Sequence, residues 1–177
     1  MRNIILVGFM ASGKTSVGRA LSRRCGWPRI DADEEIVSRA GKAIADIFQD
    51  SGEDAFRSLE RAVISDLCGK SGRIIAGGGG SFIDDENRNT MLEGGTVFYL
   101  SALPETIHRR VTGGNPNAPA RPLLAGGDPL ERIKELLNQR APAYSQAHHT
   151  IETDHLSPDQ VAEAILKICW PGLSNTH

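Results

Sequence analysis

Residues 8–15 read Gly-Phe-Met-Ala-Ser-Gly-Lys-Thr, which is the G-x-x-x-x-G-K-T pattern of a phosphate-binding P-loop. Glycines let the backbone of such a loop turn its N–H groups towards phosphate oxygens, and the N-terminus of the next helix favours negative charge. Lys14 would reach the outer phosphates of a nucleotide, and the Thr15 hydroxyl would bind Mg²⁺. The nucleotide-binding set expected here is Ala11, Ser12, Gly13, Lys14, Thr15 and Ser16.

Two acids, Asp31 and Asp33, follow a short apolar segment and should face the P-loop from the end of a neighbouring strand. One of them can bind Mg²⁺ through water, because this ion keeps several of its waters. The other can bind the hydroxyl of an acceptor. Capping the next helix is the alternative role for either acid, and the two roles can hold together.

A second glycine cluster covers residues 77–80. Backbone without side chains lets a small ligand approach closely and contact N–H groups, although the same composition also suits a flexible turn. The cluster lacks the apolar run followed by aspartate that forms an ordinary Walker B strand.

Three arginines stand where a cation is not needed for packing. Arg57 and Arg140 adjoin apolar stripes on separate predicted helices, where each either extends to solvent or serves a buried anion. Together they suggest a bidentate clamp on a carboxylate. Arg121 lies in a segment rich in glycine and proline, where it could stabilise a transferring phosphate or be a solvated loop charge.

The elements that must position these residues alternate between strand and helix. Their order predicts a parallel sheet with helices on both faces and the ligand at the carboxyl ends of the strands. Residues 112–127 break this rhythm, as a lid over a site would. Strands are predicted at 4–7, 29–31, 73–76, 96–100 and 149–152, and helices at 14–25, 34–40, through 56–67, from 84 or 85 to 92, at 104–111, from 129 and from 158, the last with Val161, Ile165 and Ile168 inward.

Length, net charge, cysteine content and hydropathy limit the classes of protein to which the chain can belong. The chain has 177 residues and a net charge of −2, which fit one domain without a general attraction to nucleic acid. Three separate cysteines without a C-x-x-C pattern indicate a reducing compartment. No apolar run approaches the roughly 20 residues of a membrane span. The N-terminus imitates a signal peptide, but cleavage there would destroy the P-loop.

The chain from Asn3 to Ile168 resembles the shikimate kinase family. The P-loop alone is common to many families, whereas the ordered set is specific. The resemblance implies a three-layer α/β/α P-loop kinase fold with strand order 2-3-1-4-5 and a mobile lid. The matching segments are the P-loop, Asp31-Ala32-Asp33, Phe56-Arg57 with Glu60, Gly78-Gly79-Gly80, Arg121-Pro122-Leu123-Leu124 and Arg140-Ala141-Pro142-Ala143-Tyr144.

The family's reaction moves the ATP γ-phosphoryl group to the 3-hydroxyl of shikimate, in aromatic amino-acid biosynthesis. By resemblance, Lys14, Asp33 and Arg121 would be catalytic, and Thr15 would bind Mg²⁺ with Asp31 behind it through water. The acceptor would be held by Asp33, Arg57, Gly78, Gly79, Gly80 and Arg140. Arg109 or Arg110 would pack on adenine, with Arg110 preferred, and Arg121 would also contact ATP.

We therefore expect a cytoplasmic, monomeric kinase of small molecules that uses Mg²⁺ and ATP and binds neither nucleic acid nor membrane. Residues 1–170 would form its single domain, and 171–177 a disordered tail. The segment before Arg121 is longer than is common, and Gly77 replaces a frequent Ser or Thr. The alternatives are a gluconate kinase, a non-catalytic binding module and a nucleotide-dependent switch that uses Asp66-Leu67-Cys68-Gly69.

Overall fold

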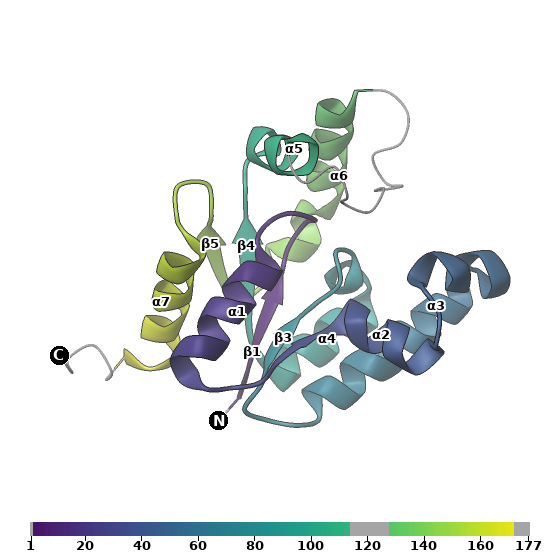
Figure 1. Ribbon diagram of the computed structural model, residues 1–177, viewed down its shortest axis with the longest axis horizontal. Coiled ribbons are helices and arrows are strands. Elements are labelled where there is room, and N and C mark those ends of the chain that lie inside the picture. The colour runs from purple at the N-terminus through teal and green to yellow at the C-terminus, as the bar shows by residue number, and fades with distance from the viewer. Residues whose placement is uncertain (1, 114–127, 172–177) are drawn as a thin grey trace.

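The computed structural model describes residues 2–113 and 128–171 (Figure 1). The described strands form one parallel sheet in the order β2-β3-β1-β4-β5, which confirms the predicted order. Their bounds are β1 Asn3–Val7, β2 Arg29–Asp31, β3 Ile74–Ala76, β4 Gly95–Ser101 and β5 His149–Glu152.

The central strand β1 is apolar along its length because both of its faces are covered. Its residues are at most 1% exposed, and Ile5 pairs with Ile75 of β3 and Val97 of β4. Successive side chains of a strand point to opposite faces. Ile5 and Val7 accordingly join one apolar cluster, and Ile4 and Leu6 join another. The predicted three-layer α/β/α architecture is confirmed by these two clusters.

Two helices, α1 (Lys14–Cys25) and α7 (Pro158–Cys169), cover one face of the sheet. The other face is covered by α2 (Ala32–Ala40), α3 (Ile44–Cys68) and α4 (Asp85–Gly94). Beyond the carboxyl end of β4, α5 (Pro104–Thr112) and α6 (Pro129–Tyr144) pack against each other (Figure 1). Their small core includes Phe9, the residue after the first glycine of the P-loop, so this pair of helices is built onto the loop.

Several boundaries differ from the sequence expectation. Helix α2 begins at Ala32 rather than 34, directly after Asp31, whose side chain accepts a hydrogen bond from the backbone N–H of Asp33. A short 3₁₀ helix, η1 (Ser81–Ile83), follows the second glycine cluster and was not anticipated. Helix α3 is interrupted at Gly52, where φ is 80° and ψ is 176°.

The prediction that Ile168 faces inward is wrong, because its side chain is 40% exposed. In the last turn of α7, Leu166 and Cys169 pack against the apolar cluster instead, and a helix places Ile168 on a different side from these two.

The proposed lid, 112–127, is described only at Thr112 and Gly113, so Arg121 lies outside the described residues. The tail from 172 lies outside them as well. Within the described part of the chain, no helix is both long and apolar enough to span a membrane.

One link between the outer strand and the sheet depends on the protonation state of an imidazole. Nδ1 of His148, the residue before β5, accepts a hydrogen bond from the backbone N–H of Val97 at 3.0 Å. The nitrogen can accept only while it carries no proton. Burial, followed by the positive charges of His149 and Arg2, lowers the pKa of His148 below its usual 6.5.

We expect this histidine to make stability depend on pH. Because its pKa is lower in the folded chain, its contribution is present above about pH 6.5 and is lost as the pH falls through the folded pKa. His148→Asn keeps an acceptor oxygen without titrating. The free energy of unfolding, measured in urea from about pH 7.5 to about pH 5, should therefore fall less in this variant than in wild type. Equal slopes would contradict this, and His155→Asn, at another exposed histidine, is the control.

Candidate active site

A cavity of about 600 Å³ lies at the carboxyl ends of the strands. It brings together three groups of residues that the sequence had singled out, namely the P-loop, the acids Asp31 and Asp33, and the second glycine cluster. The described residues in its wall are Met10, Ala11, Ser12, Gly13, Lys14, Thr15, Ser16, Val17, Asp31, Asp33, Gly77, Gly79, Arg110, Thr153, Leu156, Pro158 and Val161.

The P-loop is a tight turn whose first residue must be glycine. Gly8 has φ +149°, and a Cβ there would lie 2.7 Å from the carbonyl oxygen of Leu100 in β4. Ala11 has φ 57°, the one positive value at a non-glycine residue among the described positions. This conformation costs an L-residue roughly 1–2 kcal/mol. The loop is therefore held in a shape that its own sequence only partly favours.

Hydrogen bonds between residues of the loop stabilise this turn. Nζ of Lys14 donates to the carbonyl oxygens of Gly8 at 2.8 Å and Phe9 at 2.9 Å, which places the ammonium across the loop. The N–H of Ser12 donates to Phe9 O at 3.2 Å. The Ser12 hydroxyl is buried, with no hydrogen-bond partner within the described chain. Ser12 lines the cavity together with Lys14, Thr15 and Ser16.

The two acids have different surroundings. Asp31 is fixed, because its Oδ1 accepts from the N–H of Asp33 at 3.1 Å and its Oδ2 accepts from Nη1 of Arg29 at 3.3 Å. Burial raises the pKa of Asp33. The negative charge of Asp31 raises that pKa further, against the opposing effect of Lys14. A carboxylate with increased proton affinity suits the role of a general base.

The glycine cluster faces both the acid and a helix. A Cβ on Gly78 would lie 2.5 Å from Oδ1 of Asp33, so this carboxylate packs directly on bare backbone. The carbonyl oxygen of Gly79 accepts from Nη1 of Arg140 at 2.8 Å and from the hydroxyl of Tyr144 at 3.3 Å. The Arg140 guanidinium also lies 5.1 Å from the centre of the Phe9 ring. Arg140 therefore joins α6 to both glycine-containing loops.

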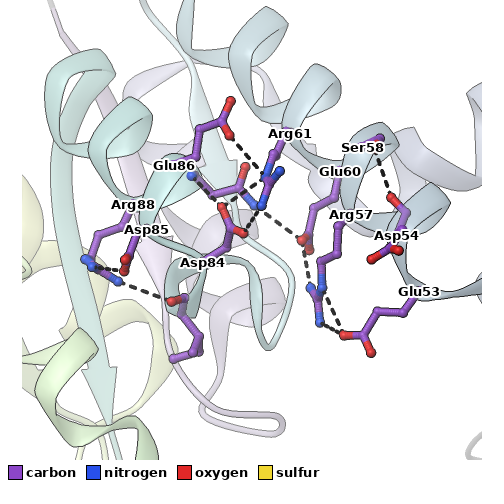
Figure 2. Close-up of polar contacts among 12 residues, drawn as sticks. Glu53, Asp54, Arg57, Ser58, Glu60, Arg61, Asp84, Asp85, Glu86 and Arg88 are labelled. Carbon is purple, nitrogen blue, oxygen red and sulfur yellow. Dashed lines mark hydrogen bonds and ion pairs between the residues drawn. The ribbon is translucent and has the colours of Figure 1, made fainter.

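Arg57 is held by two carboxylates on its own helix (Figure 2). Its Nη1 donates to Oε2 of Glu60 at 2.8 Å, and its Nη2 donates to Oε1 of Glu53 at 3.2 Å. Glu60 is only 2% exposed and also accepts from Asn87 at 3.3 Å. Burial raises the pKa of Glu60, although Arg57 opposes this, and the nearby charge of Asp33 raises it as well. Glu60 thus connects Arg57 to the surroundings of Asp33.

Arg57 and Arg140 lie on different helices, outside the described wall of the cavity. Arg140 adjoins that wall, because it donates to the carbonyl oxygen of Gly79, and Arg57 pairs with Glu60. Neither side chain simply extends into solvent, although that was the alternative for each, because each is only partly exposed and has specific partners.

Of the two arginines considered for the nucleotide base, Arg110 lies in the cavity wall. Its Nη1 donates to the carbonyl oxygen of Ala11 at 3.1 Å, and its Nη2 donates to that of Thr153 at 3.0 Å. Arg109 is not among the described residues of that wall. The geometry therefore favours Arg110.

Comparisons with known proteins agree over nearly the full chain. The family model described as shikimate kinase matches residues 10–170. A shikimate kinase of Symbiobacterium thermophilum is 44% identical over 168 residues, which cover 94% of this chain and 95% of that protein. Another from Thermodesulfovibrio yellowstonii is 41% identical over 167 residues, which cover 94% of each chain.

The chain belongs to the shikimate kinase family.

The comparison of folds supports membership of the same family. A solved shikimate kinase of Acinetobacter baumannii, in complex with shikimate, superposes with a TM-score of 0.88 at 34% identity, covering 99% of this chain and 96% of that one. The protein is thus an enzyme, a kinase that phosphorylates shikimate. Kinases of this kind use ATP, and they generally need a divalent metal ion.

The residues in the cavity fit such an ion. Thr15, Asp31 and Asp33 offer only oxygen donors, which hard divalent cations prefer. The described residues contain no group of three or more His, Cys, Asp or Glu that could enclose a metal unaided. Mg²⁺ usually takes one or two protein carboxylates and completes its coordination with phosphates and water.

Two residues at the site were not predicted from the pattern as functional side chains. Glu60 interrupts the apolar stripe of α3 three residues after Arg57, and that spacing of opposite charges was the available signal. Thr153 lies in the cavity wall and binds Arg110 across 43 positions of sequence, which no local pattern reveals.

The contact between Gly78 and Asp33 gives a direct test. Gly78→Ala would place a Cβ 2.5 Å from Oδ1 of Asp33, so the carboxylate must move. A misplacement of about 1 Å can cost on the order of 100-fold in rate, and we expect a loss of kcat of this order with the affinity for ADP preserved. Gly80→Ala is the comparison, since its Cβ would meet nothing within 4 Å. Similar losses in both variants would refute the specific role of Gly78.

Proposed function

We propose that the enzyme transfers the γ-phosphoryl group of ATP to the 3-hydroxyl of shikimate, with Mg²⁺ as the metal ion. The observation that supports this most is the single cavity that holds both the P-loop and Asp33, which packs on the second glycine cluster. A phosphoryl donor and a hydroxyl acceptor can meet there while a carboxylate receives the proton.

The donor end of the site is formed by the P-loop. The N-terminus of α1 and the loop N–H groups would hold the ATP phosphates, and Lys14 would stabilise the charge that develops during transfer. Thr15 would bind Mg²⁺ directly and Asp31 through a water, since its oxygens keep lone pairs beside their present bonds. When bound, the ion would neutralise phosphate charge. Arg121, outside the described residues, would add a further positive charge.

The acceptor end is formed by Asp33, the glycine cluster and the two arginines of α3 and α6. Asp33 would accept the proton of the hydroxyl as its oxygen bonds to the γ-phosphorus, while the bond to the bridging oxygen breaks and ADP leaves. Its raised pKa, caused first by burial, suits that role. Gly78, Gly79 and Gly80 would border the ring, and Arg57 and Arg140 would bind the carboxylate.

The remaining expectations belong to the same proposal. Residues 1–170 would be one domain with its lid at 112–127, acting as a cytoplasmic monomer on small molecules only. A net charge of −2 supports the absence of nucleic acid from its partners. ADP release measured with shikimate, gluconate and nucleoside monophosphates tests the acceptor: only shikimate should sustain rapid turnover, and preferential use of gluconate would refute the assignment.

Removing the cation of the P-loop should stop transfer. Lys14→Ala leaves no ammonium near the phosphates, and losing one such preorganised donor costs about 100- to 1,000-fold in kcat. The variant must first be shown to be folded by circular dichroism, because Lys14 also bonds the carbonyls of Gly8 and Phe9. A folded Lys14→Ala protein with near-normal kcat would exclude this role.

The arginine clamp predicts a specific pattern of substitutions. Charged hydrogen bonds contribute about 1.5–3 kcal/mol each, so Arg57→Lys and Arg140→Lys should lower kcat/KM for shikimate about 10- to 150-fold. The reason is that an ammonium cannot copy the planar fork of a guanidinium. The KM for ATP should stay near that of wild type. The matched control is Arg61→Lys, one turn from Arg57 on α3, where the side chain pairs with Asp84 (Figure 2).

An altered acceptor provides the counter-test. Shikimate reduced to the alcohol has no carboxylate, so wild type and both clamp variants should use it similarly and poorly. If wild-type enzyme phosphorylated the alcohol as well as the acid, the clamp would be disproved, whatever the clamp variants did.

A further inference from the structure

Thr153 is a buried threonine at the point where three parts of the molecule meet. It directly follows β5, is 3% exposed and lies in the cavity wall. Its Oγ1 lies 3.0 Å from the carbonyl oxygen of Ser101 at the end of β4 and 3.3 Å from that of Ser12 in the P-loop. Nη1 of Arg110 lies 3.4 Å from the same Oγ1, and Nη2 donates to the carbonyl oxygen of Thr153 at 3.0 Å.

The Thr153 hydroxyl both donates and accepts a hydrogen bond. A hydroxyl has one hydrogen to donate and lone pairs to accept with. Two carbonyl oxygens lie within reach of the hydrogen, and a guanidinium N–H is directed at the oxygen. Because Thr153 is 3% exposed, losing its hydroxyl would leave the two carbonyl oxygens without a donor at a place that water hardly reaches, and the exposed Arg110 would lose one of its acceptors. A methyl group in its place would fill the same space and satisfy none of them.

The contacts of Thr153 act on the most strained part of the P-loop. Arg110 donates to the carbonyl oxygen of Ala11, and Thr153 contacts that of Ser12. Ala11 is the residue with φ 57°. The pair formed by Arg110 and Thr153 therefore holds two successive carbonyls on the outer side of the turn, and this favours the conformation in which the loop lines the cavity.

Asp154, the next residue, binds the N-terminus of α5, whereas Arg110 lies in the last turn of that helix. Oδ1 of Asp154 accepts from the N–H of Leu103 at 2.9 Å, at a helix start that has no side-chain cap of its own. Burial favours a high pKa for Asp154, but hydrogen bonds from Leu103 and Thr106, with the charge of Arg110, lower the pKa overall. Thr153 and Asp154 thus position both ends of the helix that carries Arg110.

We propose that Thr153 is a positioning residue for the nucleotide: its hydroxyl fixes the Arg110 guanidinium and the turn at Ala11 and Ser12, and so sets the affinity for purine nucleoside di- and triphosphates. The proposal rests on the proposed function only for the identity of the ligand. ADP binding in the absence of acceptor tests it, so an error about shikimate would leave the result unaffected.

The first test is Thr153→Val, which keeps volume and branching while removing the hydroxyl. The Kd for ADP, measured by calorimetry, and the KM for ATP should each rise about ten-fold, the effect of losing one hydrogen bond that involves a charged group. The KM for shikimate and kcat should change less than about two-fold. Thr153→Ser keeps the hydroxyl and should restore most of the affinity. The matched control is Thr150→Val, an exposed threonine of β5.

A double-mutant cycle separates positioning from a general loss of stability. If Thr153 acts through Arg110, Thr153→Val should weaken ADP binding much less in an Arg110→Ala background than in wild type. Equal effects in both backgrounds would overturn the proposal. It would also fail if Thr153→Val bound ADP normally while its Tm fell, or if the KM for shikimate rose by the same factor. Should Thr153→Val not fold, Thr153→Ala and Thr153→Ser carry the same comparison.

Discussion

The turn between β1 and α1 is the constraint on which the site depends. At Gly8 the backbone comes so close to the Leu100 carbonyl that a Cβ would lie 2.7 Å away, and at Ala11 it adopts a conformation that disfavours L-residues. Such a turn does not persist by local preference alone. It is held by Lys14, which donates to the carbonyl oxygens of Gly8 and Phe9, and by Arg110, which donates to that of Ala11. Carbonyls tied back in this way leave the opposite side of the loop to its N–H groups.

Charge balance imposes a second constraint. Asp31 and Asp33 lie close enough that one raises the pKa of the other, and Glu60 adds a buried carboxylate nearby. Unpaired charges in such surroundings are costly. The chain supplies a cation to each, with Arg29 on Asp31, Arg57 on Glu60 and the charge of Lys14 acting on Asp33. Asp33 combines a raised pKa with a place in the cavity wall, whereas Glu60 is not among the described residues of that wall.

The sequence was sufficient for the fold and for placing the P-loop beside Asp31 and Asp33, and insufficient for the contacts that hold these groups in position. The P-loop, the order of strands and the meeting of acids with glycines follow from local patterns, the rules for parallel sheets and the family resemblance. The contact of Thr153 with Ser12 spans 141 positions, and that of Arg140 with Gly79 spans 61. No periodicity encodes such pairs. The misplaced Ile168 has the same origin, because the side of the last turn that faces the core is decided by Leu166 and Cys169.

The attachment of α6 shows how a loop of glycines can be made rigid. Tyr144 is 2% exposed, its ring stacks on Tyr99 of β4 with centres 4.4 Å apart, and its hydroxyl lies 3.3 Å from Gly79 O. Burial raises its pKa to about 12, so the hydroxyl keeps its proton and remains a donor at any physiological pH. Arg140, one turn earlier, donates to the same carbonyl. Gly79 needs no side chain to be fixed, because two side chains of a helix anchored on the sheet hold its carbonyl. The face of Gly79 that lines the cavity thus stays bare for a ligand without becoming disordered.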